Sequence, residues 1–215
     1  SEPVYPDDPA RFTVDELYKV GMDYFQGGQF DLAERQFSHC LEKDPKHPDA
    51  NLAMANTYYY MGKLYRAKGD KRKALQYFNG SATQFQVASQ LKPESAEPLV
   101  GYGILCLEEP KLYPQAVQTL ERALAKEPER KEKNLRVHFY LGAAYGLTGD
   151  LERSAQEYET YLEMFPFAPD RNEVEDILED NYKRRGRTYV RKPLPGDGTA
   201  PQDPSAEPSA EGAGP

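Results

Sequence analysis

The sequence predicts an all-α fold, a solenoid of four helical hairpins followed by a C-terminal helix. One pattern of residues recurs four times along the chain, which is typical of stacked repeats. Apolar residues recur at helical spacing and no segment alternates, so at least nine helices and no sheet are expected between Thr13 and Arg185. The hydrophobic fraction of 39% suits amphipathic helices that each keep one face in water.

Three copies of the repeat carry a glycine, a small residue twelve positions later and then a large side chain, and a fourth, weaker copy carries an isoleucine in the place of the glycine. In chain order these residues are Gly21, Ala33 and Phe37; Gly62, Ala74 and Phe78; Ile104 in the place of glycine, Ala116 and Leu120; and Gly142, Ser154 and Tyr158. The first glycine lets the neighbouring helix approach closely, and the large side chain fills the gap beside the second small residue. Further glycines, at Gly28, Gly69 and Gly149, end the first helix of three copies. The repeated unit is therefore predicted to be a helical hairpin.

This pattern resembles the tetratricopeptide repeat, and the resemblance covers about residues 14 to 166. It implies a right-handed superhelix of stacked hairpins with a concave groove lined by the first helix of every pair. The spacing departs from the family, because Gly21 to Gly62 spans 41 residues and Gly62 to Ile104 spans 42, against about 34 in the family. We therefore expect one extra heptad in each helix of the second hairpin, over about 49–68 and 71–90, so that this hairpin is the longest.

The expected segments follow from these boundaries and from composition. Residues 1–12 form a Pro-rich acidic leader, and Thr13 with Glu16 forms a capping box that starts the first helix. The four repeats occupy 13–168, as 14–47, 48–96, 97–130 and 135–168, with a charged insert at 129–134. A capping helix is expected at 169–186, and 187–215 is expected to be a basic and then acidic, Pro/Gly-rich disordered tail.

Charge and composition argue against several classes of partner. The formal net charge is −8, which repels polyphosphate, so nucleic acid is not an expected partner. No apolar run is long enough for a transmembrane helix. The acidic residues between 173 and 180 lack the spacing of a calcium loop and are interpreted as solvated charge. We predict no metal and no cofactor.

Residues capable of catalysis are few and do not form a predicted constellation. His39 and Cys40 are adjacent on a helix and point apart; Cys40 is expected in the core and His39 in water. His138 occupies a packing position, where we expect it partly buried and hydrogen-bonded. A whole hairpin separates Cys40 from Cys106, so both are expected to be free thiols. No enzyme is predicted.

The resemblance instead places a candidate binding site in the groove. The positions that correspond to groove residues of the family are Tyr18, Phe25, Tyr59, Tyr60, Lys63, Tyr102, Phe139 and Tyr140. Aromatic side chains offer a large contact area at little entropy cost, which suits an extended or helical peptide. The alternative is that several of these rings simply pack against the neighbouring helix. The Lys and Asn side chains that clamp a peptide carboxylate in some family members have no matching set here, which disfavours an adaptor for chaperone tails.

A secondary basic patch is expected at Lys71, Arg72 and Lys73, within a basic stretch that begins at Lys63. It could contact an acidic partner on the long hairpin. The competing interpretation is a solvated helix end, where cations are favourable near the C-terminus. A second basic stretch, from Lys183 to Lys192, borders the acidic tail.

The predicted function is a non-catalytic scaffold that binds a peptide or protein segment in its groove. The Pro-rich acidic leader is similar to the linker of bacterial outer-membrane lipoproteins of the pilotin type, which contain tetratricopeptide repeats. That resemblance implies a lipid anchor upstream of Ser1, a location at the periplasmic side of the outer membrane, and a role in assembling a pilus, secretion or motility complex of the cell envelope. The alternative hypothesis is a cytoplasmic regulatory or adaptor subunit of an enzyme complex. The oligomeric state is left open.

Overall fold

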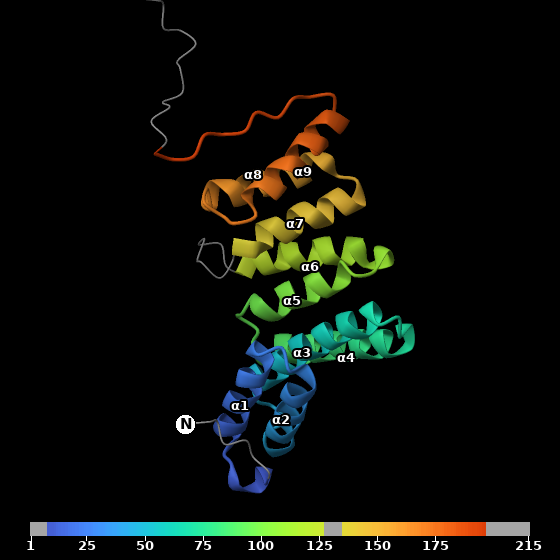
Figure 1. Cartoon of the computed structure of the whole chain (residues 1–215), viewed down its shortest axis with the longest axis vertical. Coiled ribbons are helices and arrows are strands. Elements are labelled where there is room, and N and C mark those ends of the chain that lie inside the picture. Colours follow the sequence, from blue (N-terminus) through green and yellow to red (C-terminus); the bar gives the residue numbers. More distant parts are fainter. Residues whose placement is uncertain (1–7, 127–134, 197–215) are drawn as a thin grey trace, which may run out of the picture. The chain divides into compact units, whose positions relative to one another are not determined.

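The computed structural model describes residues 8–126 and 135–196 and divides the chain into two units, Ser1–Tyr161 and Leu162–Pro215. The described residues form nine α-helices and two short 3₁₀ turns and contain no strand, which confirms the all-α prediction (Figure 1). The charged insert predicted at 129–134, residues 1–7 of the leader and residues 197–215 of the tail lie outside the described residues.

The helices pair in chain order into the four predicted hairpins. Their bounds are α1 Val14–Gln26 and α2 Phe30–Lys43; α3 Pro48–Ala67 and α4 Lys71–Leu91; α5 Glu97–Cys106 and α6 Tyr113–Lys126; and α7 Leu135–Thr148 and α8 Leu151–Met164. The 3₁₀ turns are η1 Pro9–Arg11 and η2 Pro110–Leu112, and the C-terminal helix α9 is Arg171–Arg184. The second hairpin has helices of 20 and 21 residues, whereas α1 and α2 have 13 and 14. The prediction that this hairpin is the longest is confirmed.

Within the first unit, each helix from α1 to α7 packs against the next one in the chain, as Figure 1 shows. The first helices of successive hairpins also contact one another, α1 with α3, α3 with α5, and α5 with α7. We call the surface that these four helices share the first-helix wall. This pattern of contacts is that of a solenoid, in which the core is a series of small clusters between neighbouring helices.

The predicted close approach between the two helices of a hairpin is present in all four copies. A Cβ atom added to Gly21 would lie 2.5 Å from the ring of Phe37, and Gly62 and Gly142 face Phe78 and Tyr158 in the same way, at 2.6 and 2.9 Å. Glycine is therefore needed at these positions by space. The second small residues, Ala33, Ala74, Ala116 and Ser154, are all buried.

The third hairpin differs from the sequence alignment by one residue. Leu120 packs against Gly103, where an added Cβ would come within 2.6 Å, and not against Ile104 as predicted. The interval from Gly62 is therefore 41 residues again. The shift has a local cause, because this hairpin turns through η2 at Pro110–Leu112, whereas the other three turn at a glycine with positive φ. The longer turn displaces α6 by one position relative to α5.

The ends of the helices follow the predicted signals. Thr13 accepts from the backbone N–H of Glu16 at 3.2 Å, and the Glu16 carboxylate accepts from the Thr13 N–H at 2.8 Å, which completes the capping box. Gly28, Gly69 and Gly149 have φ of 74°, 81° and 88°, a left-handed conformation that glycine adopts without steric cost. Helix existence and helix ends thus follow local sequence.

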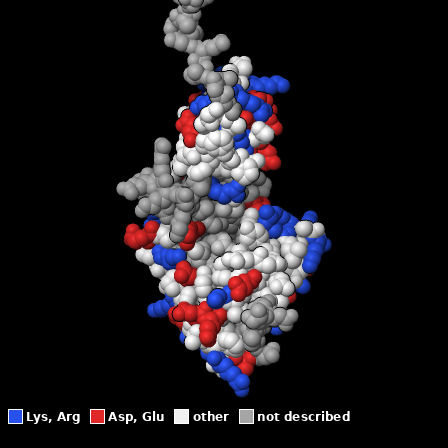
Figure 2. All heavy atoms as spheres, turned by 60° about the vertical axis from the view of Figure 1, so that its left-hand side comes forward, with Lys and Arg blue, Asp and Glu red and all other residues white. Residues whose placement is uncertain are grey.

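Charges of both signs are mixed on the surface. On the face drawn in Figure 2, acidic and basic side chains are interspersed among uncharged ones. The basic stretch from Lys63 to Lys73 is distributed over the ends of two helices. Arg66 and Lys68 lie at the C-terminal end of α3, where cations are favourable, but Lys71, Arg72 and Lys73 lie in the first turn of α4. The interpretation of the whole stretch as a C-terminal helix end is therefore wrong for these three residues, because a helix N-terminus disfavours cations.

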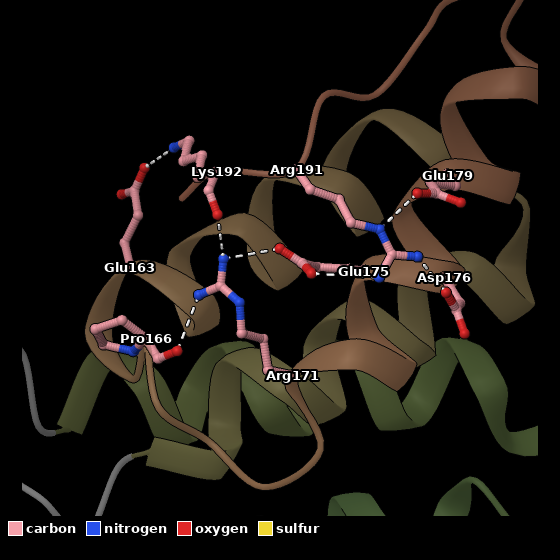
Figure 3. Close-up of polar contacts among 8 residues, drawn as sticks. All are labelled: Glu163, Pro166, Arg171, Glu175, Asp176, Glu179, Arg191 and Lys192. Carbon is pink, nitrogen blue, oxygen red and sulfur yellow. Dashed lines mark hydrogen bonds and ion pairs between the residues drawn. The ribbon is translucent and has the colours of Figure 1, made fainter. Parts of the chain in front are cut away.

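In the second unit, residues 187–194 have no regular secondary structure and bring Arg191 and Lys192 next to carboxylates of α8 and α9 (Figure 3). Arg191 forms ion pairs with Glu179 at 2.7 Å, with Glu175 at 3.5 Å and with Asp176. Lys192 forms an ion pair with Glu163 at 2.7 Å. The second basic stretch therefore pairs with carboxylates of its own unit.

Arg171 holds the same segment from the other side. It donates to the backbone oxygens of Pro166 at 2.9 Å and Lys192 at 2.7 Å, and to the Glu175 carboxylate at 2.8 Å. Glu175 is only 3% exposed, so the interpretation of the 173–180 acidic residues as solvated charge is wrong for this residue. A carboxylate can be buried here because two arginines neutralise it.

Candidate functional site

The predicted groove aromatics lie on the first-helix wall, and the structure brings most of them into one chain of contacts. At its N-terminal end, Phe25 of α1 meets Tyr60 of α3 edge to face, with ring centroids 5.7 Å apart. Phe30, the first residue of α2, stacks parallel to Tyr60 at 5.2 Å and meets Phe25 at 5.5 Å. Tyr60 is 43% exposed, so this three-ring cluster offers an open aromatic surface.

A charged centre follows next to this cluster. Tyr59 contacts Tyr60 at 5.3 Å, and its hydroxyl donates to the Glu108 carboxylate at 2.7 Å. Glu108 also pairs with Arg66 and with Lys63, whose ammonium lies 4.0 Å from the carboxylate and 5.4 Å from the Tyr59 ring centroid. Burial, and then the hydrogen bond to Glu108, raise the pKa of Tyr59 far above its ordinary value. The phenol therefore remains a neutral donor.

The chain of contacts continues into the third and fourth hairpins. Tyr102 of α5 packs against the buried cluster that Tyr59 borders and also against the one that Tyr140 borders. Tyr140 of α7 is close enough to Tyr59 to influence its ionisation, and it meets Phe139 edge to face at 5.4 Å. We call these residues the aromatic belt. They are Phe25, Phe30, Tyr59, Tyr60, Tyr102, Phe139 and Tyr140.

Two groups of predicted site residues stand apart from the belt. Tyr18 packs on Phe37 at 6.0 Å and on the His47 ring at 5.4 Å, within its own hairpin and the start of α3. Lys71 and Arg72 are exposed at the start of α4, and the Lys73 ammonium lies 4.8 Å from the Tyr65 ring centroid. The basic patch and the belt are therefore separate features.

Three residues of this site were not among those predicted from the sequence, namely Phe30, Arg66 and Glu108. The prediction omitted Phe30 because it assigned groove positions only to the first helix of each hairpin, whereas Phe30 is the first residue of a second helix. An apolar residue directly after the Gly28–Gln29 turn was the available signal. Glu108 follows the end of α5, and its partners Tyr59 and Arg66 are 49 and 42 positions away in the chain. No periodicity in the sequence could have indicated that pairing.

Of the residues considered for catalysis, Cys40, Cys106 and His138 occupy the places predicted for them. His39, expected in water, is half-buried instead, and its Nδ1 lies 3.5 Å from the Glu42 carboxylate. Cys40 and Cys106 are free and fully buried, and burial raises the pKa of each thiol to about 11, which keeps both protonated. His138 is partly buried and hydrogen-bonds Glu157 at 2.6 Å, as expected for a packing position. Over residues 8–126 and 135–196, no three His, Cys, Asp or Glu side chains gather where they could hold a metal ion. None of the helices described there has the length and apolar character needed to span a bilayer.

Comparison with known proteins identifies the class. Residues 111–169 match a sequence model of the tetratricopeptide repeat, and residues 56–85 match a second one. Together with the four stacked hairpins, these matches identify tetratricopeptide repeats within the chain. No curated protein sequence matches it.

Solved structures of the same fold include proteins of two kinds. One is PilF of Pseudomonas aeruginosa, with a TM-score of 0.61 at 23% identity over 80% of this chain and 69% of that one. Another is MamA of Desulfovibrio magneticus RS-1, with a TM-score of 0.59 at 18% identity over 85% and 88% of the two chains. A MamA RS-1 double mutant gives 0.62 at 16% identity over 84% and 87%. At these identities the likeness shows the fold alone.

Proposed function

We propose that this chain is a non-catalytic scaffold that binds a peptide or protein segment along its aromatic belt. The observation that carries the proposal is the continuity of the belt, which passes through all four hairpins by ring contacts or shared clusters. If the rings served only to pack the two helices of one hairpin together, their contacts would not need to continue into the next hairpin. Tyr60, stacked on Phe30 yet 43% exposed, is the ring best placed to accept an apolar side chain.

The charged centre adds a polar component to the same surface. Glu108 is largely buried, whereas the Lys63 and Arg66 side chains that neutralise it are 47% and 42% exposed. An ammonium and a guanidinium carry more N–H donors than one carboxylate can accept. The remaining donors suit carbonyl or carboxylate oxygens of a bound segment. We therefore expect a ligand with apolar or aromatic side chains and at least one acidic group.

The experiment compares the belt with the basic patch. Peptides selected from a phage-displayed random library against the native chain are measured with the double variant Tyr60→Ala/Tyr140→Ala and with the charge reversal of Lys71, Arg72 and Lys73 to Glu. The belt proposal expects the double variant to lose binding with unchanged helicity, and the charge reversal to retain it. Loss only in the charge reversal, mimicked by raised salt, would assign binding to the basic patch. Normal binding by both variants would exclude both surfaces.

We propose further that the scaffold assembles a complex of the bacterial cell envelope, as a lipoprotein of the outer membrane. The composition of the leader and the fold likeness to PilF support this proposal. The codons before Ser1 test it. An encoded basic start, an apolar run and a small-x-Cys site would support it, and a plain Met would favour the cytoplasmic adaptor instead.

A further inference from the structure

A pocket lies between α2 and the α3–α4 hairpin, and none of its lining residues belongs to the aromatic belt. Its volume is about 470 Å³, and its walls include Glu34, Tyr58, Tyr65, Tyr77 and Gly80. Tyr65 and Tyr77 stack in parallel at 5.4 Å, and Tyr58 is tilted against Tyr77 at 5.6 Å. A Cβ atom on Gly80 would lie 3.1 Å from the Tyr58 ring, so a larger residue would crowd this wall. The result is a pocket of three phenol rings around one carboxyl group.

The carboxyl group of this pocket, that of Glu34, forms no ion pair with any residue that the structure describes. Glu34 is half-buried and interacts with the hydroxyls of Tyr58 and Tyr77, while its charged neighbour is another acid, Asp31. Among the described residues no Lys, Arg or His lies within ion-pair distance of Glu34. Burial raises the pKa of Glu34, as expected for a carboxylate that lacks a cation. Lys73 also lines the pocket, and its ammonium lies 4.8 Å from the Tyr65 ring centroid.

The fourth hairpin contains a related site in which the acid is neutralised. Its acid stands one helical turn further along, because Glu121 directly follows Leu120, whereas Glu34 lies three residues before Phe37. Tyr145 and Arg153 stand three and eleven residues after Gly142, as Tyr65 and Lys73 do after Gly62. The Arg153 guanidinium lies 4.4 Å from the Tyr145 ring centroid and 3.6 Å from the carboxylate of Glu121 on the preceding hairpin. The Tyr145 hydroxyl donates to that carboxylate at 2.5 Å. An arginine therefore closes this site from within the chain.

We infer that the pocket at Glu34 receives an arginine side chain from a protein partner, in the role that Arg153 plays beside Glu121. A guanidinium is planar, stacks on phenol rings and donates to the lone pairs that the two tyrosine hydroxyls leave unused on Glu34. This inference goes beyond the proposed function, because the pocket is built from α2, α3 and α4 and shares no residue with the belt. Lys68 and Lys73, both at the Tyr65 ring, repel neighbouring cations, so the fitting arginine is flanked by neutral or acidic residues.

The test uses N-acetyl-L-arginine N-methylamide as the probe, with the corresponding glutamine derivative as control. Binding is followed through the ring resonances of Tyr58, Tyr65 and Tyr77 in NMR titrations of the full chain. We expect the arginine probe to shift all three rings in the millimolar range and the glutamine probe to shift none. Equal shifts with both probes would overturn the assignment.

Two variants and a matched control make the test specific. Glu34→Gln should weaken binding of the arginine probe by about tenfold or more, because it removes a charge-assisted pair. Glu42→Gln, on the same helix and with its side chain 74% exposed, should leave binding unchanged. Lys73→Arg should also weaken binding, because arginine at this position can close the pocket as Arg153 does. Unchanged binding in Glu34→Gln would overturn the inference, and if that chain failed to fold, unchanged binding in Lys73→Arg would do so.

Discussion

The contact between the second and third hairpins depends on a glycine, and replacing it gives the sharpest test of the packing. Gly101 lies inside α5, and a Cβ atom added there would be 2.5 Å from Cζ of Phe85 and closer still to Cε1. Phe85 is 1% exposed and is enclosed with Ala55 and Leu105, so its ring has no free space to move into. Real side chains do not tolerate such distances, and α4 and α5 would have to separate.

The expected magnitude combines two opposing effects. Overpacking a dense core costs about 1–3 kcal/mol, and the enclosure of Phe85 favours the upper end. Alanine in a helix interior is favoured over glycine by about 1 kcal/mol. Gly101→Ala should therefore lower the free energy of unfolding by about 2 kcal/mol. For a chain of this length that corresponds to a fall in melting temperature of roughly 4–8 °C.

The measurement is thermal and urea unfolding followed by circular dichroism, with Gly27→Ala as the control. Gly27 has negative φ and no atom closer than 3.4 Å to an added Cβ, so that variant should be neutral or slightly stabilising. Adding Phe85→Leu to Gly101→Ala should destabilise less than the sum of the two single changes, because the clash partner is reduced. A Gly101→Ala chain as stable as the native one would refute the reasoning.

Three further predictions concern other parts of the fold. Ala74→Leu, at a position 3% exposed, should cost about 1–3 kcal/mol by overpacking, whereas Leu75→Ala, 56% exposed, should change urea stability by no more than about 0.5 kcal/mol. Asp150→Ala removes the side chain that accepts from the Arg153 N–H at 3.0 Å and should cost about 1 kcal/mol at pH 7. Because that hydrogen bond lowers the pKa of Asp150, the native chain loses this contribution as the pH falls through that lowered pKa, and the two urea curves should converge once Asp150 is protonated in the folded chain. Arg191→Ala should speed amide hydrogen exchange in residues 188–192, because it removes the ion pairs that hold this segment to α9, and raised salt should have the same effect on the native chain. Unchanged protection in the variant would contradict this role of the ion pairs.

Most of the fold could be predicted because the relevant interactions are local and recur. Phe37 and Phe78 lie sixteen positions after Gly21 and Gly62, so one spacing rule predicts both contacts. The third hairpin breaks that rule by one residue, since a 3₁₀ turn takes the place of a glycine turn. A turn conformation depends on a few residues without periodicity, which is why Ile104 was assigned the place of Gly103.

The sequence by itself determined the class of protein, the order and length of the hairpins and the aromatic character of the first helices. It did so because helix periodicity, caps and small-residue spacing act over fewer than about twenty residues. Only the tertiary structure decided which side chains meet, such as Phe30 on Tyr60 or Tyr59 on Glu108. It also decided that Glu121 is neutralised by Arg153 while Glu34 is not. These pairings join different helices or hairpins, and their geometry follows from how the helices cross, which no local pattern encodes.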